Sequence, residues 1–268
     1  MKRTNIGFIG AGNMARAMVK GMCACSKLYR ISASDVSKKA LNIMCRNSRV
    51  KKASSNGALV KKAGTIILAV KPQNIQQALL PLKGTITKKH LIVSIASGVT
   101  IKKIQEAVGM KIPVVRVMPN TPALVGEGAC GYSASREVTA KDNKFAASLL
   151  RTFCRVVIKL PEKDINMVTA LSGSGPAYFF YFAEAMADAA VSKGFSRAKA
   201  SELIAQTLAG SGKLLIESGE KPESLRKKVT SKGGTTEAAI KTMNKMGIKN
   251  GIKQGVIAAK KRADRLGK

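Results

Sequence analysis

The sequence predicts a doubly wound α/β sheet followed by an all-α domain. Three observations predict this fold class. Short apolar runs alternate with helical stretches up to residue 160, a glycine-rich turn directly follows the first run, and no strand pattern appears from residue 161 onward. Strands that are apolar throughout are typical of a parallel sheet covered by helices on both faces. We therefore place a first domain over residues 1–160 and a second over residues 161–268.

The strands of the first domain are predicted from apolar runs. These runs cover residues 5–9, 30–34, 65–70, 91–96 and 114–117. Helical spacing of small and apolar residues predicts the first two helices over residues 13–25 and 36–47. Ligands of such sheets bind beyond the carboxyl ends of the strands. We therefore expect one crevice, bordered by residues 10–15, 34–35, 69–72, 96–97 and 120–121.

The turn after the first run reads Gly10-Ala11-Gly12-Asn13-Met14-Ala15. Glycines between a strand and a helix let a pyrophosphate approach the backbone amides at the helix N-terminus. The context favours a Rossmann-type dinucleotide site over a purely structural turn. Ser34 and Asp35 end the second strand, with basic residues just beyond, so they suit either the ribose of NAD or the 2′-phosphate of NADP.

The second domain is predicted to be entirely helical. A helix over residues 177–193 is apolar nearly all round and must be covered on every side. A second copy of the chain would provide that cover, so we favour a dimerisation domain over a bundle that completes its own core. Ser196 is the expected cap of the next helix, Pro222 lies at the first turn of another, and two more follow Thr236 and Gly251.

A second glycine-rich segment, Ser231-Lys232-Gly233-Gly234-Thr235-Thr236, precedes one of these helices. Consecutive amides with threonine hydroxyls suit a small carboxylate, because glycine permits the backbone angles that turn amides toward one point. An ordinary helix cap is an equally good interpretation of this segment when it is taken alone.

Composition excludes several other classes of function. The five cysteines have no zinc-type spacing and His90 is the only histidine, so we expect neither a metal site nor a Ser-His-Asp triad. The net charge of +32 comes from lysines scattered along the chain, and tryptophan is absent, which favours a generally basic surface over a specific nucleic-acid site. No apolar run is long enough to span a membrane and no export signal is visible, so a cytoplasmic location is expected.

The chain resembles the pyrroline-5-carboxylate reductases along nearly its whole length. The matching segments are residues 6–15, 69–72, 118–122, 172–178 and 229–236, of which the last two are the most specific. The resemblance implies hydride transfer from NADPH or NADH to the ring carbon of a cyclic imine, which gives L-proline in the last step of proline biosynthesis. It also implies a homodimer joined by the helical domain, and it allows a ring of such dimers.

The resemblance further implies the residues of the site. Thr236 would be the catalytic residue that hydrogen-bonds the imine nitrogen, while Ser231, Gly234 and Thr235 would hold the substrate carboxylate. Asn56 would contact the adenosine ribose. The expected cofactor-binding residues are Ile9, Gly10, Ala11, Gly12, Asn13, Met14, Ser34, Asp35, Asn56, Ala69, Val70, Lys71, Pro72, Ile95 and Ala96.

Two departures from the family pattern concern the substrate loop. Lys232 stands where the family usually has proline, and Lys227 stands where it often has aspartate. Loss of the proline should loosen the loop, because proline restricts φ. Lys232 would instead offer a positive charge to the substrate carboxylate.

Three competing interpretations are weighed against this one. Hydroxyacid dehydrogenases share the architecture but carry a catalytic lysine at the position of Phe179, which cannot transfer a proton. A different imine reductase would be separated by its substrate profile. A nucleic-acid-binding protein with an inherited cofactor fold would bind DNA tightly and sequence-dependently at physiological salt.

Overall fold

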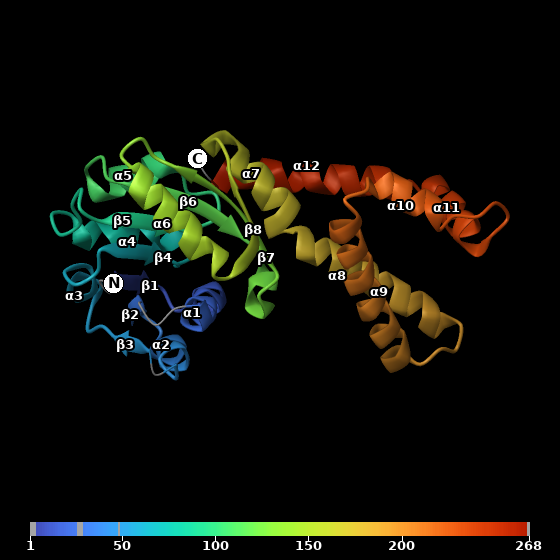
Figure 1. Ribbon diagram of the computed structural model, residues 1–268, viewed down its shortest axis with the longest axis horizontal. Coiled ribbons are helices and arrows are strands. Elements are labelled where there is room, and N and C mark those ends of the chain that lie inside the picture. The colour runs from blue at the N-terminus through green and yellow to red at the C-terminus, as the bar shows by residue number, and fades with distance from the viewer. Residues whose placement is uncertain (1–3, 26–28, 48, 267–268) are drawn as a thin grey trace. The chain divides into compact units, whose positions relative to one another are not determined.

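The computed structural model describes residues 4–25, 29–47 and 49–266 of the chain (Figure 1). The chain forms two compact units. The first unit comprises Met1–Ser174 with Ala259–Lys268, and the second unit comprises Gly175–Ala258. This division follows packing, whereas the boundary expected between residues 160 and 161 rests on where the strand pattern of the sequence ends, and it stays a prediction.

The first unit is built on one eight-stranded sheet. Its strands run in the order β3-β2-β1-β4-β5-β6-β7-β8, and every neighbouring pair is parallel except β6 and β7. The sheet confirms the predicted α/β class, although the antiparallel pair was not expected. The strands are β1 Thr4–Ile9, β2 Tyr29–Ser34, β3 Val50–Lys52, β4 Thr65–Leu68, β5 Leu91–Ser94, β6 Val114–Pro119, β7 Gly128–Ala134 and β8 Cys154–Lys159.

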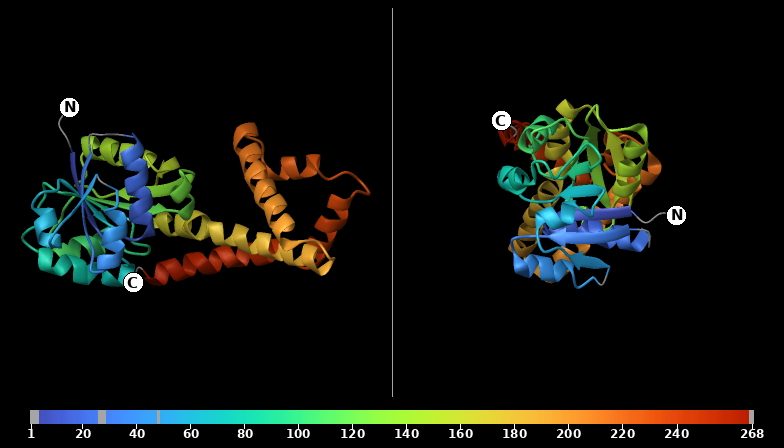
Figure 2. Two further views of the ribbon diagram at one scale, coloured as in Figure 1. Left: turned by 90° about the horizontal axis from the view of Figure 1, so that it is seen from below. Right: turned by 90° about the vertical axis from the view of Figure 1, so that its left-hand side faces the viewer.

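Helices cover both faces of the sheet (Figure 2). They are α1 Asn13–Cys25, α2 Lys38–Met44, α3 Asn56–Val60, α4 Ile75–Leu79, α5 Ile101–Val108, α6 Ala140–Arg151 and α7 Ile165–Val168. One core cluster joins the sheet to α1, α2 and α6 and includes Met18 and Leu149. A second cluster joins it to α3, α4 and α5 and includes Leu59 and Ile104. Adjacent residues of β4 enter opposite clusters, as alternating strand side chains must.

Helix α2 is shorter than the predicted helix over residues 36–47 for a local reason. The hydroxyl of Ser37 accepts the backbone N–H of Ala40 at 3.2 Å, so the helix begins after this cap rather than at Val36.

The C-terminal residues belong to the first unit because a buried polar network holds them there. The Arg116 guanidinium, 2% exposed as a residue, donates to Asn166 at 2.6 Å, and the Asn166 amide donates to Asp264 at 2.8 Å. Arg116 also pairs with Glu162 at 3.3 Å. Burial lowers the pKa of Arg116 from its usual value, and the charge of Glu162 opposes this shift.

The second unit is all helical, as predicted. It contains α8 Gly175–Ser192, α9 Arg197–Ser218, α10 Pro222–Lys228, α11 Thr235–Lys245 and the first part of α12 Ile248–Leu266. Ser196 occupies the cap position of α9, but its side chain makes no capping hydrogen bond there. Among the residues that the structure describes, no helix is both long and apolar enough to cross a membrane.

Candidate functional site

The turn between β1 and α1 is fixed by its neighbours at the carboxyl ends of β2 and β4. Gly10 has a φ of +105°, and its N–H donates to the carbonyl of Ser34 at 2.8 Å. A Cβ atom on Gly10 would lie 2.6 Å from the carbonyl carbon and oxygen of Ala69. The backbone can therefore pass between the two strands only where the side chain is a hydrogen.

Asp35 holds this turn against the end of β2. One oxygen of its carboxylate accepts the backbone N–H of Ala11 at 2.6 Å, and the other accepts the N–H of Ser37 at 2.7 Å. Such charge-assisted hydrogen bonds are stronger than neutral ones. The sequence predicted that Ser34 and Asp35 meet either the ribose of NAD or the 2′-phosphate of NADP, and nothing in the motif indicated this backbone role of Asp35.

A cleft of about 430 Å³ opens beside the turn. Six of the expected cofactor residues line this cofactor cleft: Ile9, Gly10, Ser34, Asp35, Asn56 and Val70. The remaining wall consists of residues that sequence reasoning missed, namely Val36, Asn74, Gln77, Ala78 and Pro81. Asn74 and Gln77 are exposed amides without a motif around them, so only the fold reveals their position.

The other expected cofactor residues lie along the same edge of the sheet but do not line this cleft. Ala11, Gly12, Asn13 and Met14 form the turn and the start of α1. Ala69 continues β4, where its N–H donates to the carbonyl of Ile9 at 2.8 Å, and Lys71 and Pro72 lead into α4. Ile95 and Ala96 continue β5, and the N–H of Ile95 donates to the carbonyl of Leu68 at 3.1 Å.

These residues fit a dinucleotide. A Cβ atom placed on Gly12 would meet nothing within 4 Å, so the space over the first turn of α1 is open to a phosphate. Helix α1 is thirteen residues long, and its N-terminal N–H groups attract negative charge. Asn56, Asn74 and Gln77 offer neutral hydrogen-bonding groups further along the cleft.

The glycine-rich loop of the second unit brings the expected substrate residues together before α11. Gly233 has a φ of +75°, and its N–H donates to the carboxylate of Glu237 at 2.7 Å. The N–H of Gly234 donates to the carbonyl of Ser231 at 3.1 Å. Glu237 was not predicted, yet it shapes the loop.

The two threonines of this loop differ in exposure. Thr235 and Thr236 begin α11, where helical geometry leaves backbone N–H groups without an intrahelical acceptor. Thr236 is half-buried, whereas Thr235, Ser231 and Lys232 are exposed. The loop therefore presents amides, hydroxyls and one lysine, which together can accept a carboxylate.

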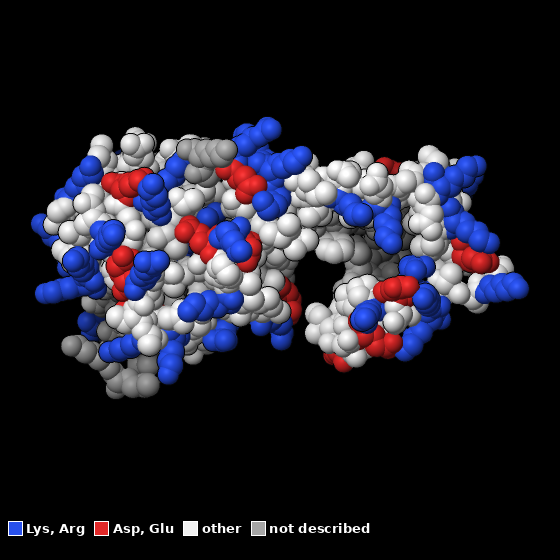
Figure 3. All heavy atoms as spheres, turned by 90° about the horizontal axis from the view of Figure 1, so that it is seen from above, with Lys and Arg blue, Asp and Glu red and all other residues white. Residues whose placement is uncertain are grey.

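Basic side chains are distributed broadly over the surface. On the face seen in Figure 3, Lys and Arg occur in both units and acidic groups lie among them. Several lysines are paired with carboxylates one helical turn away, such as Lys213 with Glu217 at 3.7 Å. A field of this kind attracts anions in general.

Comparisons with known protein families match both parts of the chain. The family model described as pyrroline-5-carboxylate reductase dimerisation covers residues 162–266. The model described as NADP oxidoreductase, coenzyme F420-dependent, covers residues 5–98. The chain therefore carries a dimerisation domain and is an NAD(P)H-dependent oxidoreductase.

Individual relatives match over the whole chain. The pyrroline-5-carboxylate reductase of Methanosarcina acetivorans is 38% identical, with both chains covered completely, and that of Arabidopsis thaliana is 36% identical over 97% of this chain and 95% of its own. A crystal structure of the Plasmodium falciparum pyrroline carboxylate reductase with NADP bound has a TM-score of 0.90 and 31% identity, covering 100% of both chains. A structure of the Coxiella burnetii enzyme has the same TM-score and 36% identity, again with full coverage. These matches confirm the resemblance seen in the sequence: the chain belongs to the pyrroline-5-carboxylate reductase family.

Proposed function

We propose that this enzyme reduces 1-pyrroline-5-carboxylate to L-proline by hydride transfer from NADPH or NADH. The observation that carries the proposal is the family match over the full length of the chain, at up to 38% identity. The cofactor cleft and the Gly233 loop supply the two kinds of site that the reaction needs. The bound nicotinamide cofactor supplies the hydride.

The residues of the first unit have the task of holding the cofactor. Gly12 and Asn13 would bind the pyrophosphate through backbone amides, beside Ala11, whose own N–H is held by Asp35. Asn56 would hydrogen-bond the adenosine ribose. Ile95 and Ala96 would line the nicotinamide side. Asp35 already accepts two backbone N–H groups, so the main role of its carboxylate is to hold the turn in place. Contact with the ribose would be an additional role of the same group.

The residues of the Gly233 loop have the task of holding the substrate. Ser231, Gly234 and Thr235 would bind the carboxylate, and the hydroxyl of Thr236 would hydrogen-bond the ring nitrogen. An imine that enters protonated already has an electrophilic carbon, so the protein mainly sets distance and orientation. Orientation of this kind is worth about 7–11 kcal/mol in favourable cases.

The proposed activity is tested by following NADPH and NADH oxidation with and without pyrroline-5-carboxylate. We expect substrate-dependent oxidation of at least one cofactor, with L-proline as the product. Folded protein that oxidises neither cofactor would contradict the proposal. A panel of other cyclic imines separates this reductase from imine reductases of other specificity.

The role of Thr236 is tested with a matched pair of variants. Thr236→Ala should lower turnover while the affinity for NADPH stays unchanged. Thr242→Ala is the control, because this exposed threonine lies on the same helix and its hydroxyl is bonded to the carbonyl of Ala238 at 3.1 Å. Equal turnover in the two variants would remove Thr236 from the site.

The assembly that we propose is a homodimer joined by the helices of the dimerisation domain. Exposed aromatic residues on α8 support it, because a patch of this kind on a soluble chain marks an interaction surface. A ring of such dimers is a further level of assembly, and light scattering would determine its mass. The cytoplasmic location stays a prediction, to be checked by fractionation.

A further inference from the structure

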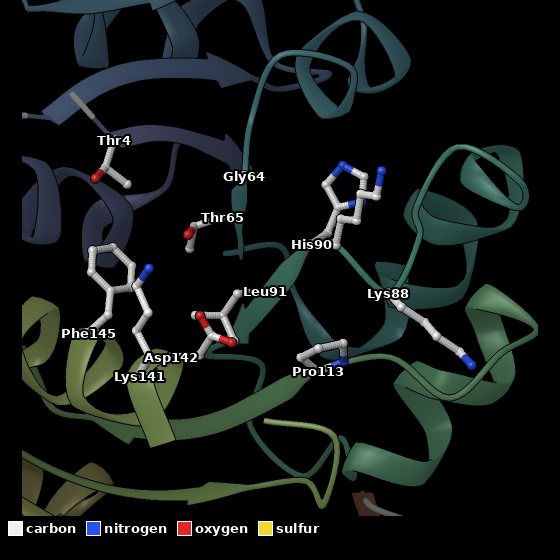
Figure 4. A pocket seen from close by; sticks show the side chains of 11 residues that line it. Thr4, Gly64, Thr65, Lys88, His90, Leu91, Pro113, Lys141, Asp142 and Phe145 are labelled. Carbon is white, nitrogen blue, oxygen red and sulfur yellow. The ribbon is translucent and has the colours of Figure 1, made fainter. Parts of the chain in front are cut away.

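A second cavity lies at the amino-terminal edge of the sheet, the edge opposite the cofactor cleft (Figure 4). Its volume is about 260 Å³. Thr4 and Thr65 line it from the first residues of β1 and β4, and the loop before β5 and the first turn of α6 complete its wall. The reductase reaction assigns no role to any of these residues.

The charge around this amino-edge cavity is positive. Lys88, Lys89 and Lys141 line it, and among the described residues the only acidic one in the lining is Asp142. The carboxylate of Asp142 accepts the hydroxyl of Thr139 at 2.7 Å, which takes up part of its hydrogen-bonding capacity. The three lysine side chains form no ion pair with any described residue. The cavity therefore favours an anion.

Two side chains of this wall, Thr65 and His90, can each donate a hydrogen bond to a ligand in the cavity. Thr65 is only 4% exposed, and its hydroxyl has no hydrogen-bond partner among the described residues. His90 accepts the backbone N–H of Thr87 at Nδ1, at 2.9 Å, so the neutral ring carries its hydrogen on Nε2. The Thr65 hydroxyl is not enclosed by protein, so it is open to a ligand oxygen that enters the cavity.

The rest of the wall is apolar. Leu91 is 4% exposed, Pro113 is buried and the ring of Phe145 is half-buried. Figure 4 shows the Lys141 amino group and the Phe145 ring on the same side of the cavity as Thr4 and Thr65. An anionic group at Lys141 and a compact apolar body against Phe145 can thus be held next to each other in one cavity.

We propose that the amino-edge cavity binds a small phosphate monoester. The phosphate would contact Lys141 and the hydroxyl of Thr65, and the apolar part of the ester would lie against Leu91 and Phe145. A phosphate monoester suits the Lys141 ammonium and the Thr65 hydroxyl better than a carboxylate does, because it is close to a dianion at neutral pH and has three strong acceptor oxygens.

This cavity and the cofactor cleft can be filled at the same time. Strands β1 and β4 begin at the amino-edge cavity, and the Gly10 turn and Ala69 follow their other ends. A ligand of the cavity is therefore separated from the cofactor by the length of these strands.

The test is a calorimetric titration of phenyl phosphate into the full-length protein, with and without saturating NADPH. We expect one site per chain and the same affinity in both conditions. Thr65→Val and Lys141→Gln should each weaken binding about tenfold or more, because each removes a hydrogen bond to a charged group. Lys62→Gln, an equal change of charge at an exposed lysine outside the cavity, should leave the affinity unchanged.

Several outcomes would overturn the proposal. These are no saturable binding, displacement of phenyl phosphate by NADPH, or equal weakening in Lys62→Gln and Lys141→Gln. Lys141 is exposed, so its variant tests the site even where Thr65→Val disturbs folding. Inorganic phosphate should bind more weakly than phenyl phosphate, and equal affinities would overturn the apolar half of the proposal.

Discussion

The two units of this enzyme bury their apolar side chains to very different extents. The first unit fully buries large residues in two clusters, such as Phe8 and Met18 in one and Leu79 in the other. The core of the second unit consists of Ala187, Ala200 and Ile204. Phe180 and Tyr181, by contrast, are 68% and 76% exposed. The first unit thus encloses its own core, whereas the second leaves an apolar surface that the proposed homodimer would cover.

The same contrast holds for the two glycine-rich loops. The Gly10 turn is tied to β2 and β4, which are distant in sequence, by hydrogen bonds and by a close backbone approach. The Gly233 loop is held by Ser231 and Glu237, which are its neighbours in sequence. We expect substitutions in the first loop to affect stability and substitutions in the second to affect mainly substrate binding.

The largest effect is expected where the apolar surface of the second unit is made polar. Phe180→Asp should weaken subunit association by about 3–4 kcal/mol, because buried aromatic residues dominate such interfaces. Light scattering and circular dichroism should show monomers with a less stable helical unit. Met110→Asp is the control, since this residue is 40% exposed in the first unit and should leave the mass unchanged. A Phe180→Asp protein with the parental mass would show that α8 lies outside the interface.

The next effect concerns the Gly10 turn. Gly10→Ala should lower the free energy of unfolding by about 1–3 kcal/mol, because the added methyl group meets Ala69 at a positive φ. Gly12→Ala should leave that free energy nearly unchanged and weaken NADPH binding, because it fills the open space over α1. Denaturant unfolding and calorimetric titration measure the two quantities. Equal stability of the two variants would refute this distinction.

A smaller effect is expected at Asp35. Asp35→Asn replaces one of its two acceptor oxygens with an amide donor, and the N–H of Ala11 or Ser37 then loses its partner. The free energy of unfolding should fall by about 1–2 kcal/mol. The ratio of kcat/KM for NADPH to that for NADH should rise, because a negative charge near the ribose is removed. A ratio that falls would contradict this placement of the carboxylate.

The smallest effect is expected in the Gly233 loop. Lys232 has a negative φ and donates no backbone hydrogen bond to a described residue, so proline would neither meet a positive φ nor remove a hydrogen bond there. Lys232→Pro should raise the free energy of unfolding by about 0.4–1 kcal/mol, because proline lowers the conformational entropy of the unfolded chain. If Lys232 attracts the substrate carboxylate, the KM for pyrroline-5-carboxylate should rise, and Lys232→Gln should raise it equally. A rise with proline alone would assign the effect to loop geometry.

The strands that could be predicted from the sequence are those that contain an apolar run. The predicted runs correspond to β1, β2, β4, β5 and β6, each of which buries at least half of its residues. Strand β3 was missed because only Val50 of its three residues is buried. Strand β7 was missed because it consists largely of glycine, alanine and serine. These strands are stabilised by their neighbours in the sheet rather than by a local pattern.

The site could be predicted only where a motif marks the backbone. The Gly10 turn and the Gly233 loop are visible in the sequence because glycine is required at a positive φ. Gln77 and Pro81 reach the cofactor cleft through the packing of α4, which no local pattern encodes. The bond from Ala11 to Asp35 spans 24 positions and depends on the pairing of β1 with β2.

The most direct test of this account follows deuterium from the cofactor to the product. Purified enzyme would be given pyrroline-5-carboxylate and NADPH that carries deuterium at both positions of the nicotinamide C4, so that transfer from either face is detected. The account predicts L-proline with a single deuterium on the ring carbon that was double-bonded to nitrogen. Folded enzyme that forms no proline, or proline without deuterium at that carbon, would contradict it.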